Sequence, residues 1–125
     1  MLVDTDVLIW NFRGNERAAQ SLDQSRAISL SAVTYMELLQ GLRDQSEFRQ
    51  LRQAIRYWQA DILHLDHDIS SRAMYLVETY SLSHGLQMAD ALVASTALSA
   101  GLPLFTANDK HYRFIDGLEI TIFRP

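Results

Sequence analysis

The sequence predicts an α/β protein, a three-layer α/β/α sandwich in which helices cover both faces of a mostly parallel central sheet. Short apolar runs, each followed by polar residues, alternate with longer segments in which apolar side chains recur every three or four residues. The short runs are typical of buried strands and the longer segments of amphipathic helices. Strands that alternate with helices favour a parallel sheet covered on both faces.

Length and composition predict one domain over residues 1–125. Of these residues 48% are hydrophobic, and no repeat or Ser/Gly-rich stretch suggests a linker. Cysteine is absent, which fits a reducing compartment such as the cytoplasm. The N-terminus has no basic leader, and no segment approaches the ~18 apolar residues of a membrane span. We therefore expect a cytoplasmic protein without a membrane segment.

Elements in the first half of the chain follow from apolar spacing and capping residues. The apolar run that ends at Asp4 predicts a strand. Ser31 is a good helix N-cap and separates a short apolar run from a helical pattern. Between residues 46 and 60 the apolar side chains share one helical face. The other predicted elements are a helical turn at 8–12, a helix at 16–24, a strand at 27–30 and a helix from 31 to about 43.

In the second half, a helix running towards residue 83 is predicted, with Asp66 or Asp68 as its N-cap and Gly85 at its end. The next segment, residues 86–101, is apolar on nearly every side, so we expect a central, buried helix there. Strands are predicted at 62–65, 104–105 and 119–123.

The net charge of −4 argues against a broadly basic surface that holds nucleic acid. Three arginines, Arg49, Arg52 and Arg56, nevertheless share one face of the helix predicted at 46–60. They fit a solvated face, or a contact with RNA or with an acidic partner.

Acidic residues occur where an apolar strand or helix gives no reason for them. Asp4 and Asp6 follow the first strand, and Asp90 is the only charge in the buried helix. Glu37 is the only charge in the segment from 27 to 42. Two of these acids also have a purely structural explanation. Asp90 could cap its helix or pair with an arginine, and Glu37 could be an ordinary exposed residue of a helix.

These acids are predicted to meet. The carboxyl ends of parallel strands and the starts of the helices that follow them lie at one edge of a sheet. Asp4, Glu37, Asp90 and the pair Asn108 and Asp109 all occupy such positions. Gathered carboxylates repel one another, so they must share protons or bind a cation, and oxygen ligands favour Mg²⁺ or Mn²⁺. Two such ions would support hydrolysis of a phosphodiester bond.

Four segments cover essentially the whole chain as a pattern: LVDTDVLI at 2–9, SAVTYMELLQG at 31–41, ADALVA at 89–94 and LFTANDKHY at 104–112. In this order and at these separations they resemble the PIN domain, and within it the VapC-type toxin ribonucleases of bacterial toxin–antitoxin pairs. The resemblance implies an endoribonuclease that depends on Mg²⁺ or Mn²⁺ and hydrolyses RNA with a metal-activated water. It also implies a homodimer, and a small antitoxin protein that covers the site.

The resemblance places Asp4, Glu37 and Asp90 in an acidic core that binds metal and carries catalysis. A fourth acidic position falls on Asn108 or on Asp109, and we assign it to Asp109.

Two neighbouring residues add to this site. Asp6 stands where the family usually has asparagine, which makes it a further candidate ligand or a supporting acid. Thr106 either orients a water at the metal or is simply the last residue of a strand.

Other functions fit the sequence less well. The pair Asp4 and Asp6 matches the nucleophile and acid/base of haloacid-dehalogenase-like phosphatases, but Leu8 stands where that pattern has Thr or Val. A non-catalytic, metal-binding regulatory module of the receiver type would need a phospho-acceptor, for which Asp66 is the candidate and has no supporting acids nearby. The four histidines show no metal-ligand spacing.

Overall fold

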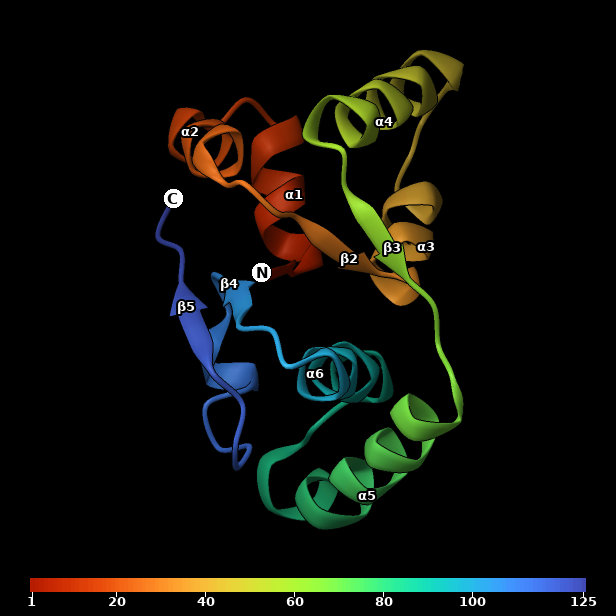
Figure 1. The fold of residues 1–125 in the computed structure, drawn as a ribbon, viewed down its shortest axis with the longest axis vertical. Helices are drawn as coiled ribbons and strands as arrows, with labels where there is room; N and C mark the ends of the chain where they lie inside the picture. The colour runs from red at the N-terminus through yellow and green to blue at the C-terminus, as the bar shows by residue number, and fades with distance from the viewer.

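The protein is built on a five-stranded sheet, seen in a computed structural model that describes residues 1–125. The strand order is β3-β2-β1-β4-β5, and every neighbouring pair is parallel. Helices lie on both faces of the sheet (Figure 1), which confirms the predicted three-layer α/β fold. The strands are β1 (Leu2–Val3), β2 (Ser29–Ser31), β3 (Asp61–Leu63), β4 (Leu104–Thr106) and β5 (Ile120–Ile122).

Five of the six helices occupy the positions that the sequence predicts, and α1 is longer than the predicted helical turn at 8–12. The helices are α1 (Thr5–Phe12), α2 (Glu16–Gln24), α3 (Ala32–Gln40), α4 (Gln45–Trp58), α5 (His67–His84) and α6 (Met88–Ala100). A short 3₁₀ helix, η1 (Asp109–His111), follows β4 and is not predicted by the sequence pattern. None of the helices combines the length and the apolar character that crossing a membrane requires.

The core has two halves because the two residues of the central strand β1 point to opposite faces of the sheet. Leu2 belongs to the apolar cluster formed mainly with α5 and α6. Val3 belongs to the cluster formed with α1, α2 and α4. In Figure 1 these two groups of helices lie on opposite sides of the strands. β1 is thereby fixed between the layers, and so is the residue that follows it, Asp4.

Helix caps explain where several elements begin. The side chain of Asp4 accepts a hydrogen bond from Thr5 N, so α1 begins at Thr5 rather than near residue 8 as predicted. Ser31 caps α3 and Asp66 caps α5, as the sequence indicates. Gly85 ends α5 with φ of +68°, a conformation that glycine adopts without strain.

The helix predicted to be central and buried is α6. Six of its residues are buried, and its most extensive packing contact is with α5. A hydrogen bond from Ser95 Oγ to the carbonyl of Ile69, 2.6 Å long, joins the two helices. α6 begins close to the centre of the molecule, which carries Asp90 in its first turn towards the sheet.

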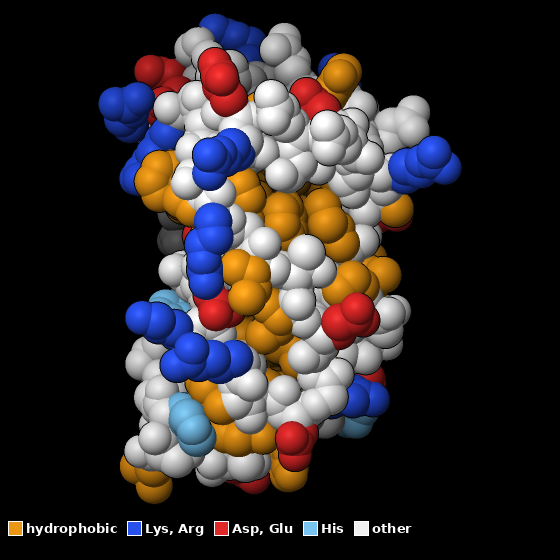
Figure 2. Space-filling view, turned by 90° about the vertical axis from the view of Figure 1, so that its left-hand side faces the viewer, with side chains coloured by type: hydrophobic (Ala, Val, Ile, Leu, Met, Phe, Trp, Pro, Cys, Tyr) orange, Lys and Arg blue, Asp and Glu red, His pale blue; other side chains and the backbone are white.

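The side of the molecule at β5 exposes an edge of the sheet. Ile122 on this strand is half exposed. Figure 2 shows this side, with apolar side chains running down its middle and Lys and Arg side chains gathered along its left margin. Positive charge is therefore locally concentrated on a chain whose net charge is −4.

Candidate active site at the carboxyl edge of the sheet

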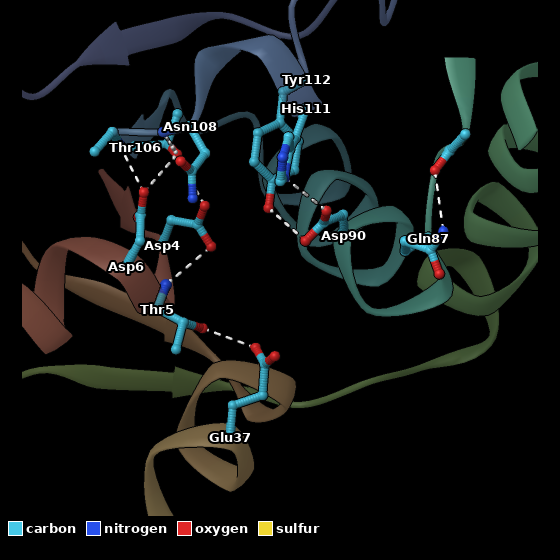
Figure 3. A network of polar contacts seen from close by, with 12 residues as sticks. Asp4, Thr5, Asp6, Glu37, Gln87, Asp90, Thr106, Asn108, His111 and Tyr112 are labelled. Atoms are coloured by element: carbon cyan, nitrogen blue, oxygen red, sulfur yellow. Dashed lines mark hydrogen bonds and ion pairs between the residues drawn. The ribbon is translucent and has the colours of Figure 1, made fainter. Parts of the chain in front are cut away.

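Asp4 lies at the carboxyl end of β1, between two neighbouring segments that fix both of its oxygens. Oδ1 accepts from Thr5 N at 2.9 Å, and Oδ2 accepts from the Thr106 hydroxyl at 2.9 Å. Thr106 ends β4, the strand paired with β1, so the contact joins residues far apart in sequence. The side chain is almost fully buried. Asp4 is therefore held rigidly at the floor of the site (Figure 3).

Asp6 connects the start of α1 to the loop after β4. Its Oδ2 accepts from Ala107 N at 2.9 Å, and its Oδ1 accepts from Val7 N at 2.8 Å. Asn108 N in turn donates to the Thr106 hydroxyl at 2.9 Å. Both oxygens of Asp6 thus accept backbone N–H groups, so the main contribution of this residue is to shape the loop beside Asp4.

The electrostatics of this pair are unusual because no cation balances them. Burial, with the charges of Asp6 and Asp90, raises the pKa of Asp4 to about 7, against the opposing hydrogen bonds from Thr106 and Thr5. Burial also raises the pKa of Asp6, although backbone hydrogen bonds from Ala107 and Val7 oppose it. None of the ion pairs in the protein includes Asp4 or Asp6. Negative charge is therefore confined at this edge of the sheet.

Asp90 reaches the same site from α6. Its Oδ1 accepts from the Tyr112 hydroxyl at 3.1 Å, and its Oδ2 lies 3.3 Å from His111 Nδ1. Gln87 is the N-cap of α6, and no arginine contacts Asp90. Both structural alternatives raised for Asp90, a helix cap and an arginine pair, are therefore wrong.

Glu37 approaches from α3 on the solvent side. Its Oε1 accepts from the Thr5 hydroxyl at 2.8 Å, and Oε2 makes no hydrogen bond. Figure 3 shows its carboxylate directed towards the start of α1, below Asp4. Glu37 is exposed, as its structural alternative requires, but it is tied to the residue that follows Asp4 rather than free in solvent.

The two candidates for the fourth position face different ways. Asp109 Oδ1 accepts from Arg124 Nη2 at 2.9 Å, and this hydrogen bond lowers the pKa of Asp109. The side chain of Asn108 instead points towards Asp4 (Figure 3). The structure thus brings Asp4, Glu37, Asp90 and Asn108 to one edge of the sheet and engages Asp109 in an ion pair with Arg124.

Three side chains at this edge were not identified from the sequence. Tyr112 and His111 were not proposed as site residues, but both contact Asp90. Arg124 donates to the carbonyl of Ala107 at 3.1 Å as well as to Asp109. The only signal for the first two was their position shortly after the carboxyl end of a predicted strand, and nothing in the sequence pointed to Arg124.

The chemistry of the residues fits a divalent cation such as Mg²⁺ or Mn²⁺. As the side chains stand, no group of three or more His, Cys, Asp or Glu residues is arranged to hold a metal ion. Mg²⁺ does not need such a group, since it commonly takes one or two carboxylates and completes its shell with water and substrate phosphate. A buried carboxylate with a raised pKa, beside two others and without a cation, is the kind of site that a divalent ion stabilises. Asp4 with Asp90 or Glu37 would supply those oxygens.

A parallel α/β sheet with acidic side chains gathered at its carboxyl edge defines an α/β domain with an acidic candidate active site. The model of the PIN domain family matches residues 1–117, and the chain belongs to this family. It is similar to ribonuclease VapC19 of Mycobacterium tuberculosis, with 29% identity over 94% of this chain and 96% of that protein.

Solved structures give the same result. A toxin–antitoxin complex from Klebsiella pneumoniae contains a chain with a TM-score of 0.80 and 28% identity, covering 96% of this chain and 94% of that one. VapBC2 from Rickettsia felis, bound to a promoter DNA fragment, matches with a TM-score of 0.84 over 98% of both chains. At 16% identity, this second likeness shows the fold alone.

Proposed function

We propose that this protein is an endoribonuclease that depends on Mg²⁺ or Mn²⁺ and is the toxin of a toxin–antitoxin pair, acting on RNA in the cytoplasm. The observation that carries the proposal is the meeting of Asp4, Glu37 and Asp90 at one edge of the sheet. These acids come from three separate segments, and no Lys or Arg pairs with any of them. Similarity to a ribonuclease over nearly the whole chain supports the choice of RNA as substrate.

The residues that would hold the metal are Asp4, Glu37, Asp90 and, at the fourth position, Asn108. We place Asn108 there rather than the predicted Asp109, because Asp109 is engaged by Arg124. When bound, the divalent ion would supply positive charge for the substrate phosphate and would lower the pKa of a water molecule, so that the water can lose a proton and act as the nucleophile at neutral pH.

The protein's own groups orient this chemistry. Thr106 and the backbone N–H of Thr5 fix the Asp4 carboxylate between two strands. Asp6 fixes the loop that carries Asn108. Glu37 stands at the open side with one oxygen free of hydrogen bonds, so it is the acid best placed to accept a proton from a water molecule there.

The test measures cleavage of a defined RNA by the purified protein with Mn²⁺, with Mg²⁺ and with chelator. We expect Asp4→Asn, Glu37→Gln and Asp90→Asn each to reduce kcat/KM by at least about 100-fold, since each removes charge from the site. Asp61→Asn is the matched control, because Asp61 is an exposed acid at the first residue of β3, the opposite edge of the sheet. Undiminished cleavage by Asp4→Asn and Asp90→Asn would reject the assigned site.

The phosphatase alternative is disfavoured by Asp6. An acid/base needs an oxygen that can exchange a proton with substrate, but both oxygens of Asp6 accept backbone N–H groups. The regulatory alternative is disfavoured by Asp66, whose carboxylate caps α5 through Ile69 N at 2.8 Å.

We also propose that a cognate antitoxin binds in a groove beside Glu37. The groove, about 590 Å³, lies between α1, α3 and α4. Five of its eleven lining residues are apolar, namely Ile9, Phe12, Leu38, Leu42 and Leu51. An apolar segment of a small partner fits this lining, and in this place it would obstruct access to Glu37. The similar Klebsiella chain was solved in a toxin–antitoxin complex, which supports a protein partner as the occupant.

The antitoxin proposal is tested by co-expression with the product of a short reading frame just upstream on the same transcript, the place where such a partner is expected to be encoded. We expect the two proteins to co-purify and the product to inhibit RNA cleavage. Phe12→Glu, at a groove residue that is 39% exposed, should abolish both effects, whereas Tyr57→Glu, at an exposed residue of α4 outside the groove, should not. Equal inhibition of both variants would place the partner elsewhere, and no co-purification would overturn the proposal.

A homodimer is proposed on the same family grounds. Light scattering with size-exclusion chromatography measures its mass directly. A mass of about 28.6 kDa, twice the 14.3 kDa of the chain, is expected, and a monomer at micromolar concentration would contradict it.

A further inference from the structure

Asp90 is held by two adjacent residues that come from a different part of the chain. Tyr112 donates its hydroxyl to Oδ1 at 3.1 Å, and His111 Nδ1 lies 3.3 Å from Oδ2. Both follow β4 at the end of η1, whereas Asp90 lies in the first turn of α6. Figure 3 shows the two rings descending side by side onto the Asp90 carboxylate. Each oxygen of Asp90 therefore has its own partner.

Of the two partners, Tyr112 is the fixed one. It is only 1% exposed and belongs to the apolar cluster between the sheet and α6. His111 is more than half exposed. A buried phenol has little freedom to turn, and its hydroxyl needs a partner. Burial and the charges of Asp4 and Asp90 raise the pKa of Tyr112 well above its usual range, so the hydroxyl remains a donor at neutral pH.

The hydroxyl of Tyr112 counteracts the electrostatic repulsion between Asp4 and Asp90. Asp4 and Asp90 lie close enough for each charge to affect the same phenol, and the charge of Asp90 also raises the pKa of Asp4. Without a donor between the strands and α6, the partly exposed Asp90 carboxylate would turn towards solvent. A hydrogen bond to one oxygen does not block metal binding, because each carboxylate oxygen has a second lone pair.

We propose that Tyr112 is a positioning residue of the metal site: its hydroxyl holds the Asp90 carboxylate facing Asp4, with His111 as a weaker second support. The inference rests on the proposed function, since it concerns the same metal site. Donors that hold a metal-binding carboxylate in place commonly change metal affinity by 10-fold to 100-fold when they are removed. Tyr112 acts through Asp90 and needs no contact with substrate.

The test is the Mn²⁺ affinity of the metal-free protein, measured by isothermal titration calorimetry on Tyr112→Phe. The matched control is Tyr80→Phe, which removes a hydroxyl packed against the same apolar cluster. That hydroxyl only accepts a 3.4 Å hydrogen bond from Asp116 N, away from Asp90. We expect Tyr112→Phe to weaken Mn²⁺ binding by about 10-fold or more. Tyr80→Phe should stay within about 2-fold of the wild type, and His111→Ala should lie between the two.

Two further readouts separate positioning from folding. The Tm of metal-free Tyr112→Phe should stay close to that of the wild type, because the ring remains and water can replace its hydroxyl at the partly exposed Asp90. Saturating Mn²⁺ should restore most of the kcat for RNA cleavage, since a weakened site can still be filled.

The outcomes distinguish the inference from the proposed function. If the wild type and Tyr112→Phe bind Mn²⁺ equally, or if Tyr112→Phe binds more tightly, the positioning role is wrong while the metal site stands. If the wild type binds no Mn²⁺, the metal site and the role of Tyr112 are overturned together.

Discussion

Asp4 shows how the fold creates reactivity from an ordinary carboxyl group. Its position after β1 places it between two layers of apolar side chains, and its neighbours include Asp6 and Asp90. Its hydrogen bonds come from Thr5 and Thr106, neither of which carries charge. The ionised form is therefore costly until a cation arrives, and this cost should appear in the stability of the metal-free protein.

The first prediction concerns the pH dependence of that stability. The pKa of Asp4 is raised from 3.8 to about 7, so the folded protein retains a proton that the unfolded chain has already released. Stability should therefore fall as pH rises from about 4 to about 7. Asp4→Asn removes this loss. The free energy of unfolding of Asp4→Asn minus that of the wild type should therefore be about 2–4 kcal/mol larger at pH 8 than at pH 4.

Urea unfolding in the presence of chelator measures this difference at pH 4, 6 and 8. Asp61→Asn, an exposed acid outside the site, provides the control and should follow the wild-type curve. Parallel curves for the wild type and Asp4→Asn would contradict the burial of an uncompensated charge.

At the scale of elements, the loop after β4 is the part of the site that the sequence described least well. The short apolar run at 104–105 predicted β4 and the polar residues after it predicted the loop, but not which side chain of the loop faces inward. That choice depends on Arg124, which lies at the far end of the sequence and binds both Asp109 and the carbonyl of Ala107. A contact between residues this far apart along the chain cannot be recognised from the sequence near Asp109.

The second prediction follows from this loop. Asp109→Asn and Arg124→Gln should each cause a moderate loss of about 3-fold to 10-fold in kcat/KM, because both break the ion pair between Asp109 and Arg124. The loss should be at least as large for Arg124→Gln, since Arg124 also donates to the carbonyl of Ala107. Neither should change Mn²⁺ affinity by more than about 2-fold, whereas Asn108→Ala should weaken it, because the side chain of Asn108 points towards Asp4 and that of Asp109 is engaged by Arg124. Calorimetry with Mn²⁺ and cleavage assays on the same samples measure these effects. A larger loss of Mn²⁺ affinity in Asp109→Asn than in Asn108→Ala would restore Asp109 as the fourth ligand.

Helix caps were the best predicted local features, because capping depends on residue types within a few positions. Ser31 and Gly85 occupy the predicted positions. Of the two caps considered for α5, Asp66 is the cap, while Asp68 binds Arg72 and Ser99. The arginines of α4 are exposed, as expected for a solvated helix face.

The third prediction tests the cap of α5. Asp66→Ala should lower the free energy of unfolding by about 1 kcal/mol, the usual cost of losing an aspartate N-cap. Urea unfolding measures the loss. Cleavage of RNA should remain at the wild-type level, and a loss of activity without a loss of stability would return Asp66 to consideration as a functional residue.

At the scale of the molecule, strand order explains why the acids meet. β1 and β4 are neighbours at the centre of the sheet although nearly the whole sequence separates them. Parallel pairing then brings the ends of both strands to one edge, and α3 and α6 begin at that edge. The sequence allowed this convergence to be inferred from a general property of parallel sheets. It could not supply the strand order, nor the contacts of Asp90 with Tyr112 and His111, which depend on how α6 packs.

Anomalous diffraction at the manganese absorption edge, from crystals grown with Mn²⁺, would locate a divalent ion held jointly by Asp4, Glu37 and Asp90. We expect an anomalous peak at the carboxyl edge of the sheet, within about 2.5 Å of oxygens from Asp4 and at least one of the other two acids. Crystals of Asp90→Asn should show a weaker peak or none. A strong manganese peak elsewhere on the molecule, with none beside Asp4, would show that these three acids do not form a metal site.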